Sequence, residues 1–157
     1  MAADPAFMQM AIDLAMKNVQ TGGGGPFGAV VVKDGKVVAA EANCVTATND
    51  PTAHAEVMAI RKACQALGSF QLEGCEIYTS CEPCPMCLGA IYWARPKAVY
   101  YANTRAQAAD AGFDDAFIYD ELPLPPEQRT LKMSQLRLPA AQEHFDAWVG
   151  SQLQVKY

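Results

Sequence analysis

Two short stretches of the sequence carry residue types that bind metal ions and move protons. One is His54-Ala55-Glu56, and the other is Pro83-Cys84-Pro85-Met86-Cys87. Proteins bind zinc through imidazole nitrogens and thiolate sulfurs, and a catalytic site leaves one coordination position to water. His54, Cys84 and Cys87 are therefore the candidate ligands of one Zn²⁺ ion per chain.

Both stretches are expected at the beginning of a helix. Residues 53–67 have a helical composition and are followed by Gly68, and residues 84–94 read as a helix that ends before Pro96. At a helix start, two cysteines three residues apart lie on one face, so both sulfurs can reach the same ion. The helix N-terminus also favours the thiolate form, which is the form that binds metal.

Glu56 is the candidate proton carrier. It follows His54 by two residues, so its carboxylate could reach a metal-bound water rather than the metal itself. Zinc lowers the pKa of bound water to about 7, and a neighbouring carboxylate can take that proton and pass it to a substrate. The combined H-x-E…P-C-x-x-C pattern is typical of zinc deaminases, which use these residues for hydrolytic deamination.

Other interpretations of the same residues remain open. A structural zinc site would close its coordination with a fourth ligand, and Cys81 is evenly spaced with Cys84 and Cys87. The Cys84–Cys87 spacing also fits a thioredoxin-like redox pair, which would leave His54 and Glu56 without a role. A zinc-binding interaction module without catalytic activity is the alternative from a different functional class.

The composition predicts a folded domain that acts on a small molecule. The chain of 157 residues has a formal net charge of −5, whereas proteins that grip a phosphate backbone usually carry a basic surplus. We therefore expect no nucleic-acid partner. No segment reaches the roughly 20 apolar residues that cross a membrane, so we expect a cytoplasmic protein whose six cysteines are thiols or ligands.

The order of predicted elements is that of an α/β protein. Asp4-Pro5 begins a helix that runs to about residue 20, and Gly22–Gly25 end it. Gly23, Gly25 and Gly28 are expected to let a loop pass close to a ligand. Asp34-Gly35 lies between two β-branched runs and predicts a hairpin. The remaining elements are strands at 75–79 and 98–101, a bulged or broken strand at 131–138, a helix at 139–150 and a tail at 151–157.

The chain resembles the bacterial guanine deaminases of the cytidine deaminase superfamily. The resemblance is carried by the segments around both zinc motifs, Thr52–Val57 and Thr79–Arg95, by Ala111-Gly112-Phe113-Asp114-Asp115 and by the terminal Lys156-Tyr157. It implies one domain over residues 1–157 with a three-layer αβα cytidine-deaminase-like fold. In that fold a mixed sheet of about five strands carries helices on both faces.

The resemblance also implies an activity and a set of substrate contacts. The activity would be the hydrolysis of guanine to xanthine and ammonia, with Glu56 and Asp115 as catalytic acids and bases. The contacts to the purine would come from Phe27, Asn43, Ala55, Trp93, Asp115 and Tyr157. Taken without the resemblance, Asn43 could form a turn, the two aromatic residues could belong to the core, and Asp115 could lie in a solvated loop.

Finally, the resemblance implies a homodimer with an exchanged C-terminus. Residues of about 127–157 would cross to the partner subunit, Leu122–Pro126 would connect, and Tyr157 would close over a site. The related tRNA adenosine deaminases share the zinc motifs, but they need a basic surface to grip RNA. The acidic chain therefore favours a small purine base over tRNA or another nucleobase.

Overall fold

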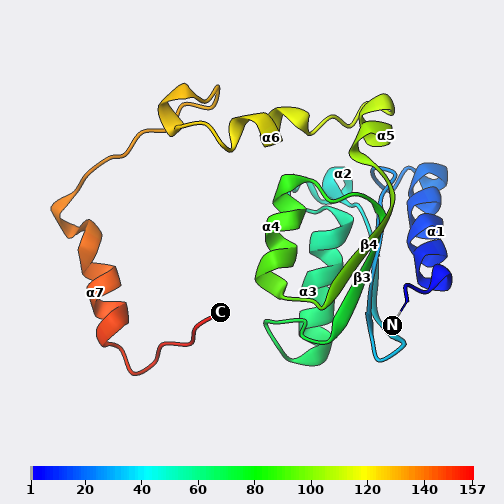
Figure 1. Cartoon of the computed structure of the whole chain (residues 1–157), viewed down its shortest axis with the longest axis horizontal. Helices are drawn as coiled ribbons and strands as arrows, with labels where there is room; N and C mark the ends of the chain where they lie inside the picture. The colour runs from blue at the N-terminus through cyan, green and yellow to red at the C-terminus, as the bar shows by residue number, and fades with distance from the viewer. Residues whose placement is uncertain (1) are drawn as a thin grey trace. The chain divides into compact units, whose positions relative to one another are not determined.

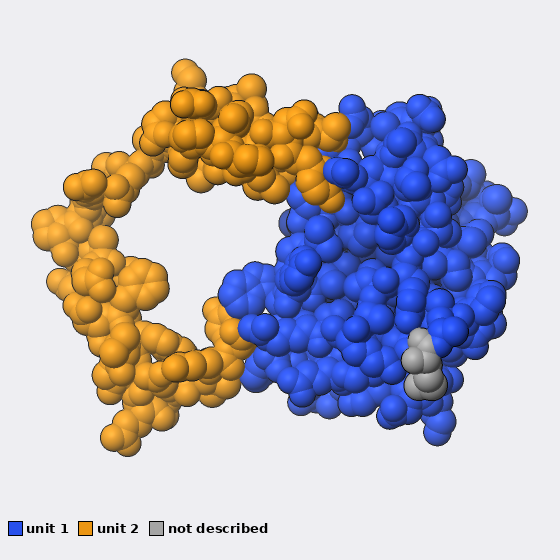
Figure 2. All heavy atoms as spheres, in the orientation of Figure 1, with its two compact units in different colours: residues 1–115 blue, residues 116–157 orange. Residues whose placement is uncertain are grey.

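The structure is a computed structural model that describes residues 2–157. The chain divides into two compact units, which Figure 2 colours separately. Unit 1 extends to Asp115 and unit 2 covers Ala116–Tyr157. The sheet, the hydrophobic core and the candidate zinc ligands all belong to unit 1.

A four-stranded mixed sheet in the order β2-β1-β3-β4 forms the centre of unit 1. β1 pairs antiparallel with β2 and β3, whereas β3 and β4 are parallel. The expectation of about five strands was too high by one, because residues 132–138 lie in no helix or strand of the described chain and pair with no neighbour. The strands are β1 (Gly28–Lys33), β2 (Lys36–Ala42), β3 (Cys75–Cys81) and β4 (Ala98–Asn103).

The predicted hairpin between β1 and β2 is confirmed, and the geometry of its turn explains why Asp34 and Gly35 occupy it. Asp34 and Gly35 both have positive φ, at 49° and 73°. A two-residue turn of this kind matches the twist of the flanking strands and requires residues that tolerate the left-handed region, which Asp and Gly do.

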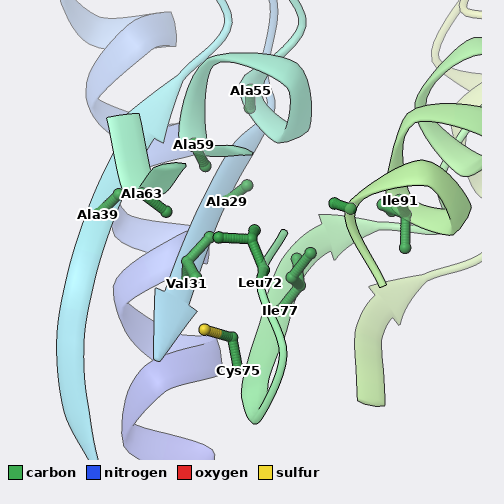
Figure 3. Packing of buried hydrophobic residues seen from close by; sticks show 11 residues of the cluster. Ala29, Val31, Ala39, Ala55, Ala59, Ala63, Leu72, Cys75, Ile77 and Ile91 are labelled. Carbon is green, nitrogen blue, oxygen red and sulfur yellow. The ribbon is translucent and has the colours of Figure 1, made fainter. Parts of the chain in front are cut away.

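Helices cover both faces of the sheet, which gives the predicted three layers (Figure 1). Because side chains alternate along a strand, Val30 and Val32 of β1 pack with Tyr78 beneath α1, whereas Ala29 and Val31 point to the opposite face. There they join the larger core cluster under α3 and α4 (Figure 3). The three helices are α1 (Pro5–Thr21), α3 (Ala55–Leu67) and α4 (Pro85–Ala94).

The predicted ends of these helices agree with the structure. The Asp4 side chain caps α1, and Gly22 ends it in the left-handed conformation. Gly68 ends α3 in the same way, at φ 61°. Three short helices were not predicted, because four to six residues carry too little periodicity to be recognised: α2 (Val45–Thr48), α5 (Arg105–Asp110) and α6 (Ala116–Glu121).

Unit 2 has helical turns but no buried residue. The helix expected at 139–150 is present as a 3-10 turn, η2 (Pro139–Gln142), followed by α7 (Glu143–Gly150). A second 3-10 turn, η1 (Pro126–Gln128), lies in the proline-rich loop. Within the described residues, no helix combines the length and apolarity that a membrane crossing requires.

Val31 and Val37 provide a test of the core. Val31 is fully buried in β1, whereas Val37 in β2 keeps 41% of its surface exposed. Val31→Ala should lower the free energy of unfolding by about 1.5–3 kcal/mol, since it removes buried methyl groups and leaves a cavity. The matched Val37→Ala change should cost roughly 0.5 kcal/mol. Urea denaturation measures both, and equal losses would contradict the core described above.

Candidate active site

The three candidate ligands of the sequence pattern meet at one point of unit 1. The ligand atoms of His54, Cys84 and Cys87 all lie within 4.8 Å of one another. His54 Nδ1 is 3.6 Å from Cys84 Sγ and 3.4 Å from Cys87 Sγ. In a tetrahedral zinc site with bonds of about 2.0–2.3 Å, ligand atoms are separated by roughly 3.5–3.8 Å. The donor set and its spacing therefore fit a zinc ion.

Two helix starts bring these ligands together. His54 is the N-cap residue of α3, and Cys84 is the N-cap residue of α4. Cys87 lies three residues further along α4, and its backbone N–H donates to Cys84 Sγ at 3.5 Å. The partial positive charge of a helix N-terminus stabilises an anionic sulfur placed there.

The sulfur of Cys84 is the one most strongly held as a thiolate. The Cys87 thiol, the His54 ring and the Cys87 N–H all hydrogen-bond it and lower its pKa to about 4. The pKa of Cys87 is raised, first because its thiol donates to Cys84 and then because it is buried. A divalent cation bound between the two sulfurs would replace that shared proton, since metal ligands must be deprotonated.

Cys81 does not complete a four-ligand structural site. It is not part of the group that can hold a metal, and its thiol lies 3.8 Å from the Thr104 carbonyl oxygen instead. Burial raises the pKa of Cys81 to about 11, so it remains a thiol. A redox pair is also disfavoured, because His54 and Glu56 both contact the Cys87 sulfur.

Glu56 is buried next to the ligands, as the motif predicted. The Thr79 hydroxyl donates to Glu56 Oε1 at 3.3 Å, and Glu56 Oε2 lies 3.5 Å from the Cys87 sulfur. Burial raises the pKa of Glu56 above its ordinary value. Such a carboxyl group gains a proton more readily than an exposed one, which suits a group that must both accept and donate protons.

A cavity of about 530 Å³ opens beside this cluster. Small-molecule sites typically enclose about 300–1,000 Å³, so the cavity has room for a purine-sized ligand. His54, Glu56 and Cys84 line it together with three of the predicted substrate contacts, which are Phe27, Asn43 and Asp115.

Three other predicted contacts are not among the residues that line the cavity. The Ala55 side chain is fully buried in the core cluster of α3. Trp93 lies on α4 with 61% of its surface exposed, and Tyr157 belongs to unit 2. Their substrate contacts remain predictions.

Phe27 and Asn43 each have a structural role and also lie in the wall of the cavity, so the two alternatives left open by the sequence are compatible. Phe27 packs against the core cluster and makes an edge-to-face contact with Phe113 at 5.0 Å, while it also lines the cavity. The Asn43 side chain accepts the Val45 N–H at 3.1 Å, which is a local turn, and Asn43 lines the same cavity.

Asp115 lies in the cavity wall in an environment that favours its neutral form. Burial is the main cause that raises its pKa, and the negative charge of Cys84 adds to it, whereas Arg105 acts in the opposite direction. A perturbed carboxyl group in a cavity is a candidate for proton transfer.

Sequence reasoning missed several residues around the site. Thr79, which holds Glu56, could have been found from its place at the end of a strand before the cysteine motif. Glu82 and Arg105 also line the cavity, and the Glu82 carboxylate binds both the Arg105 backbone N–H at 3.0 Å and its Nε at 3.4 Å. Nothing in the sequence indicated that pair, because its members are 23 positions apart.

Comparison with known proteins agrees with this geometry. Residues 1–103 match the family model of the cytidine and deoxycytidylate deaminase zinc-binding region. The chain belongs to this family of zinc-dependent deaminases.

Individual relatives extend the match beyond the zinc motifs. The chain is 60% identical to guanine deaminase of Bacillus subtilis over 142 residues, which cover 90% of this chain and 91% of that protein. The X-ray structure of guanine deaminase from Bacillus subtilis superimposes with a TM-score of 0.97 at 55% identity, over 99% of both chains. A tRNA-specific adenosine deaminase of Agrobacterium fabrum is 45% identical over 89 residues, 55% of this chain and 59% of that protein.

Two cysteine variants test the three-ligand site. Cys84→Ser should reduce bound zinc from one ion per chain to nearly none, because it removes a thiolate ligand. Cys81→Ser should leave the zinc content unchanged, since Cys81 lies outside the ligand group. Elemental analysis of the purified full-length chains measures both, and loss of zinc from Cys81→Ser would favour a closed structural site instead.

Proposed function

We propose that this protein hydrolyses guanine to xanthine and ammonia, with zinc held by His54, Cys84 and Cys87. The observation that carries the proposal is the near-complete likeness to guanine deaminase of Bacillus subtilis, at 60% identity over 90% of the chain. The partial match to a tRNA-specific adenosine deaminase covers only 55% of the chain. The net charge of −5 further favours a free base over RNA.

In this proposal the protein residues carry the protons and orient the base. When bound, zinc acts as a Lewis acid that lowers the pKa of a coordinated water to about 7. Glu56 would take one proton from the attacking water and pass it to a ring nitrogen. It would then take the second proton from the same oxygen and pass it to the amine that leaves from C2. One C–O bond forms and one C–N bond breaks, so guanine and water give xanthine and ammonia. The Thr79 hydroxyl, which donates to Glu56 Oε1 at 3.3 Å, holds the carboxylate in place for these transfers.

Substrate recognition is assigned to the cavity wall. Asn43 would bind a polar edge of the purine, and the Phe27 ring would pack against its face. Asp115 would contact the substrate amine or pass its proton onward, consistent with a raised pKa. The backbone of Ala55 would offer a further contact next to the ligand His54.

We further infer that two subunits exchange residues 127–157. Unit 2 buries none of its residues within its own chain, although Leu131, Leu136 and Leu138 are apolar and 62–84% exposed. Tyr92 and Trp93 of α4 are also exposed, at 74% and 61%. Apolar surface of this extent is covered in most proteins by a partner. The partner here would be a second copy of this chain, and Tyr157 would close over a site.

A cytoplasmic location is inferred from the thiolate ligands, which persist in a reducing compartment.

A substrate panel tests the activity directly. The zinc-loaded protein should release ammonia from guanine, but not from cytosine, adenine or an adenosine-containing tRNA anticodon stem-loop. Glu56→Gln is the matched control, and it should retain zinc while losing roughly 10²–10⁴-fold in turnover, as expected for removal of a general acid and base. Release of ammonia from the RNA but not from guanine would exclude the proposed substrate.

Truncation tests the role of the C-terminal tail. Deletion of residues 151–157 should lower guanine turnover by about tenfold or more, because an open site admits water and orients the base poorly. Its zinc content and its circular dichroism should not change. Lys156→Ala serves as the control, since it alters the tail without removing Tyr157. If the truncated chain turned over guanine at the full rate, Tyr157 could not act as a lid.

A further inference from the structure

Asn18 is a buried polar residue that the proposed chemistry does not use. It lies in the last turn of α1, keeps 9% of its surface exposed and does not line the cavity. Its side-chain amide donates twice, to the Gly25 carbonyl oxygen at 3.0 Å and to the Asn43 carbonyl oxygen at 2.7 Å. One amide group thus joins the glycine loop to the end of β2.

Asn18 also anchors the loop through its backbone. The Asn18 carbonyl oxygen accepts the N–H of Gly22, which ends α1, and that of Gly23 at 3.2 Å. The loop then passes so close to Asn43 that a side chain at Gly24 would lie 2.1 Å from the Asn43 carbonyl oxygen. Glycine is required there because only glycine permits this approach.

These contacts leave one polar group of Asn43 for a ligand. Its backbone N–H donates to the Phe27 carbonyl oxygen at 3.1 Å, and its carbonyl oxygen accepts from Asn18. Its side-chain oxygen accepts the N–H groups of Gly25 and Val45, at 3.3 and 3.1 Å. Rotating the amide would turn its NH₂ group toward two N–H donors, so the orientation is fixed. Among residues 2–157, the Asn43 Nδ2 has no hydrogen-bond acceptor.

We propose that Asn18 is a positioning residue that holds Asn43 with its amide donor toward the cavity. The proposal rests on the proposed function in assigning the cavity to a base. The fixed orientation means that Asn43 offers the base a donor and not an acceptor. It therefore selects the edge of a base that carries a carbonyl oxygen or an unprotonated ring nitrogen, and it disfavours an exocyclic amine at that point.

Hydrogen exchange of the full-length, zinc-loaded protein without substrate tests the positioning. Asn18→Asp keeps the size of the side chain but removes both donors and faces two carbonyl oxygens with a carboxylate. Exchange protection of the Gly25 and Val45 amides, which donate to Asn43, should fall about tenfold or more. Protection in β1 and β3 should not change. Asn18→Ser, which shortens the side chain without adding a charge, should act in the same direction and serves if the first variant does not fold.

Thr21→Val is the matched control at the same helix end. It removes a side-chain hydrogen bond to the Lys17 carbonyl oxygen but no contact with Asn43. Protection of the Gly25 and Val45 amides should remain at the level of the unaltered protein. Unchanged protection in both Asn18 variants would overturn the proposal. Loss of protection throughout the sheet would also overturn it, since Asn18 would then serve only overall stability.

Kinetics with guanine separates this inference from the proposed function. Asn18→Asp should raise KM about tenfold with a much smaller change in kcat, as expected when substrate binding is weakened. Combined with Asn43→Ala, the Asn18 change should add little, because both act through the same contact. Additive effects would overturn the proposal. If the unaltered protein did not turn over guanine, the proposed function would fail, and the exchange experiment would still decide the role of Asn18.

Discussion

The site depends on the burial of a carboxyl group beside two sulfurs. The Cys87 sulfur contacts the Glu56 carboxylate, and both cysteine sulfurs contact the His54 ring. Anionic groups in a protein interior are costly unless positive charge and hydrogen bonds compensate them. The N-termini of α3 and α4 supply part of that compensation, and a zinc ion on the three ligands supplies the rest. Hydrogen bonds from Cys87 and His54 lower the pKa of Cys84, whereas burial raises the pKa of Glu56.

The fold provides the rigid frame that this arrangement needs. β3 is buried along its whole length, and it carries Thr79, which holds Glu56, on the strand that leads into the cysteine helix. Asn18 ties the loop after α1 to Asn43, which lines the cavity. The side chains that line the cavity thus come from widely separated parts of the chain. Each is carried by a packed helix or strand or by a hydrogen-bonded loop, which limits its motion before a substrate binds.

Much of the fold could be predicted because its signals are local. The hairpin turn, the capping Asp4 and the helix-ending Gly22 and Gly68 act within a few residues of their own position, and the structure agrees with each. The prediction of a fifth strand was wrong because a strand forms only when it hydrogen-bonds to a neighbouring strand. The local residue pattern does not show whether such a neighbour exists. The stretch at 132–138 has the residues of a strand but no paired strand in the described chain.

The same division holds for the site. The sequence by itself identified the candidate ligands His54, Cys84 and Cys87 and the candidate proton carrier Glu56, because they lie in two short motifs whose chemistry follows from residue type and helical spacing. Only the tertiary structure decided that Cys81 stays outside the ligand group and that the Asn43 amide has one orientation. These outcomes depend on contacts between residues far apart in the chain. Such contacts arise when the helices pack on the sheet, and no local spacing encodes them.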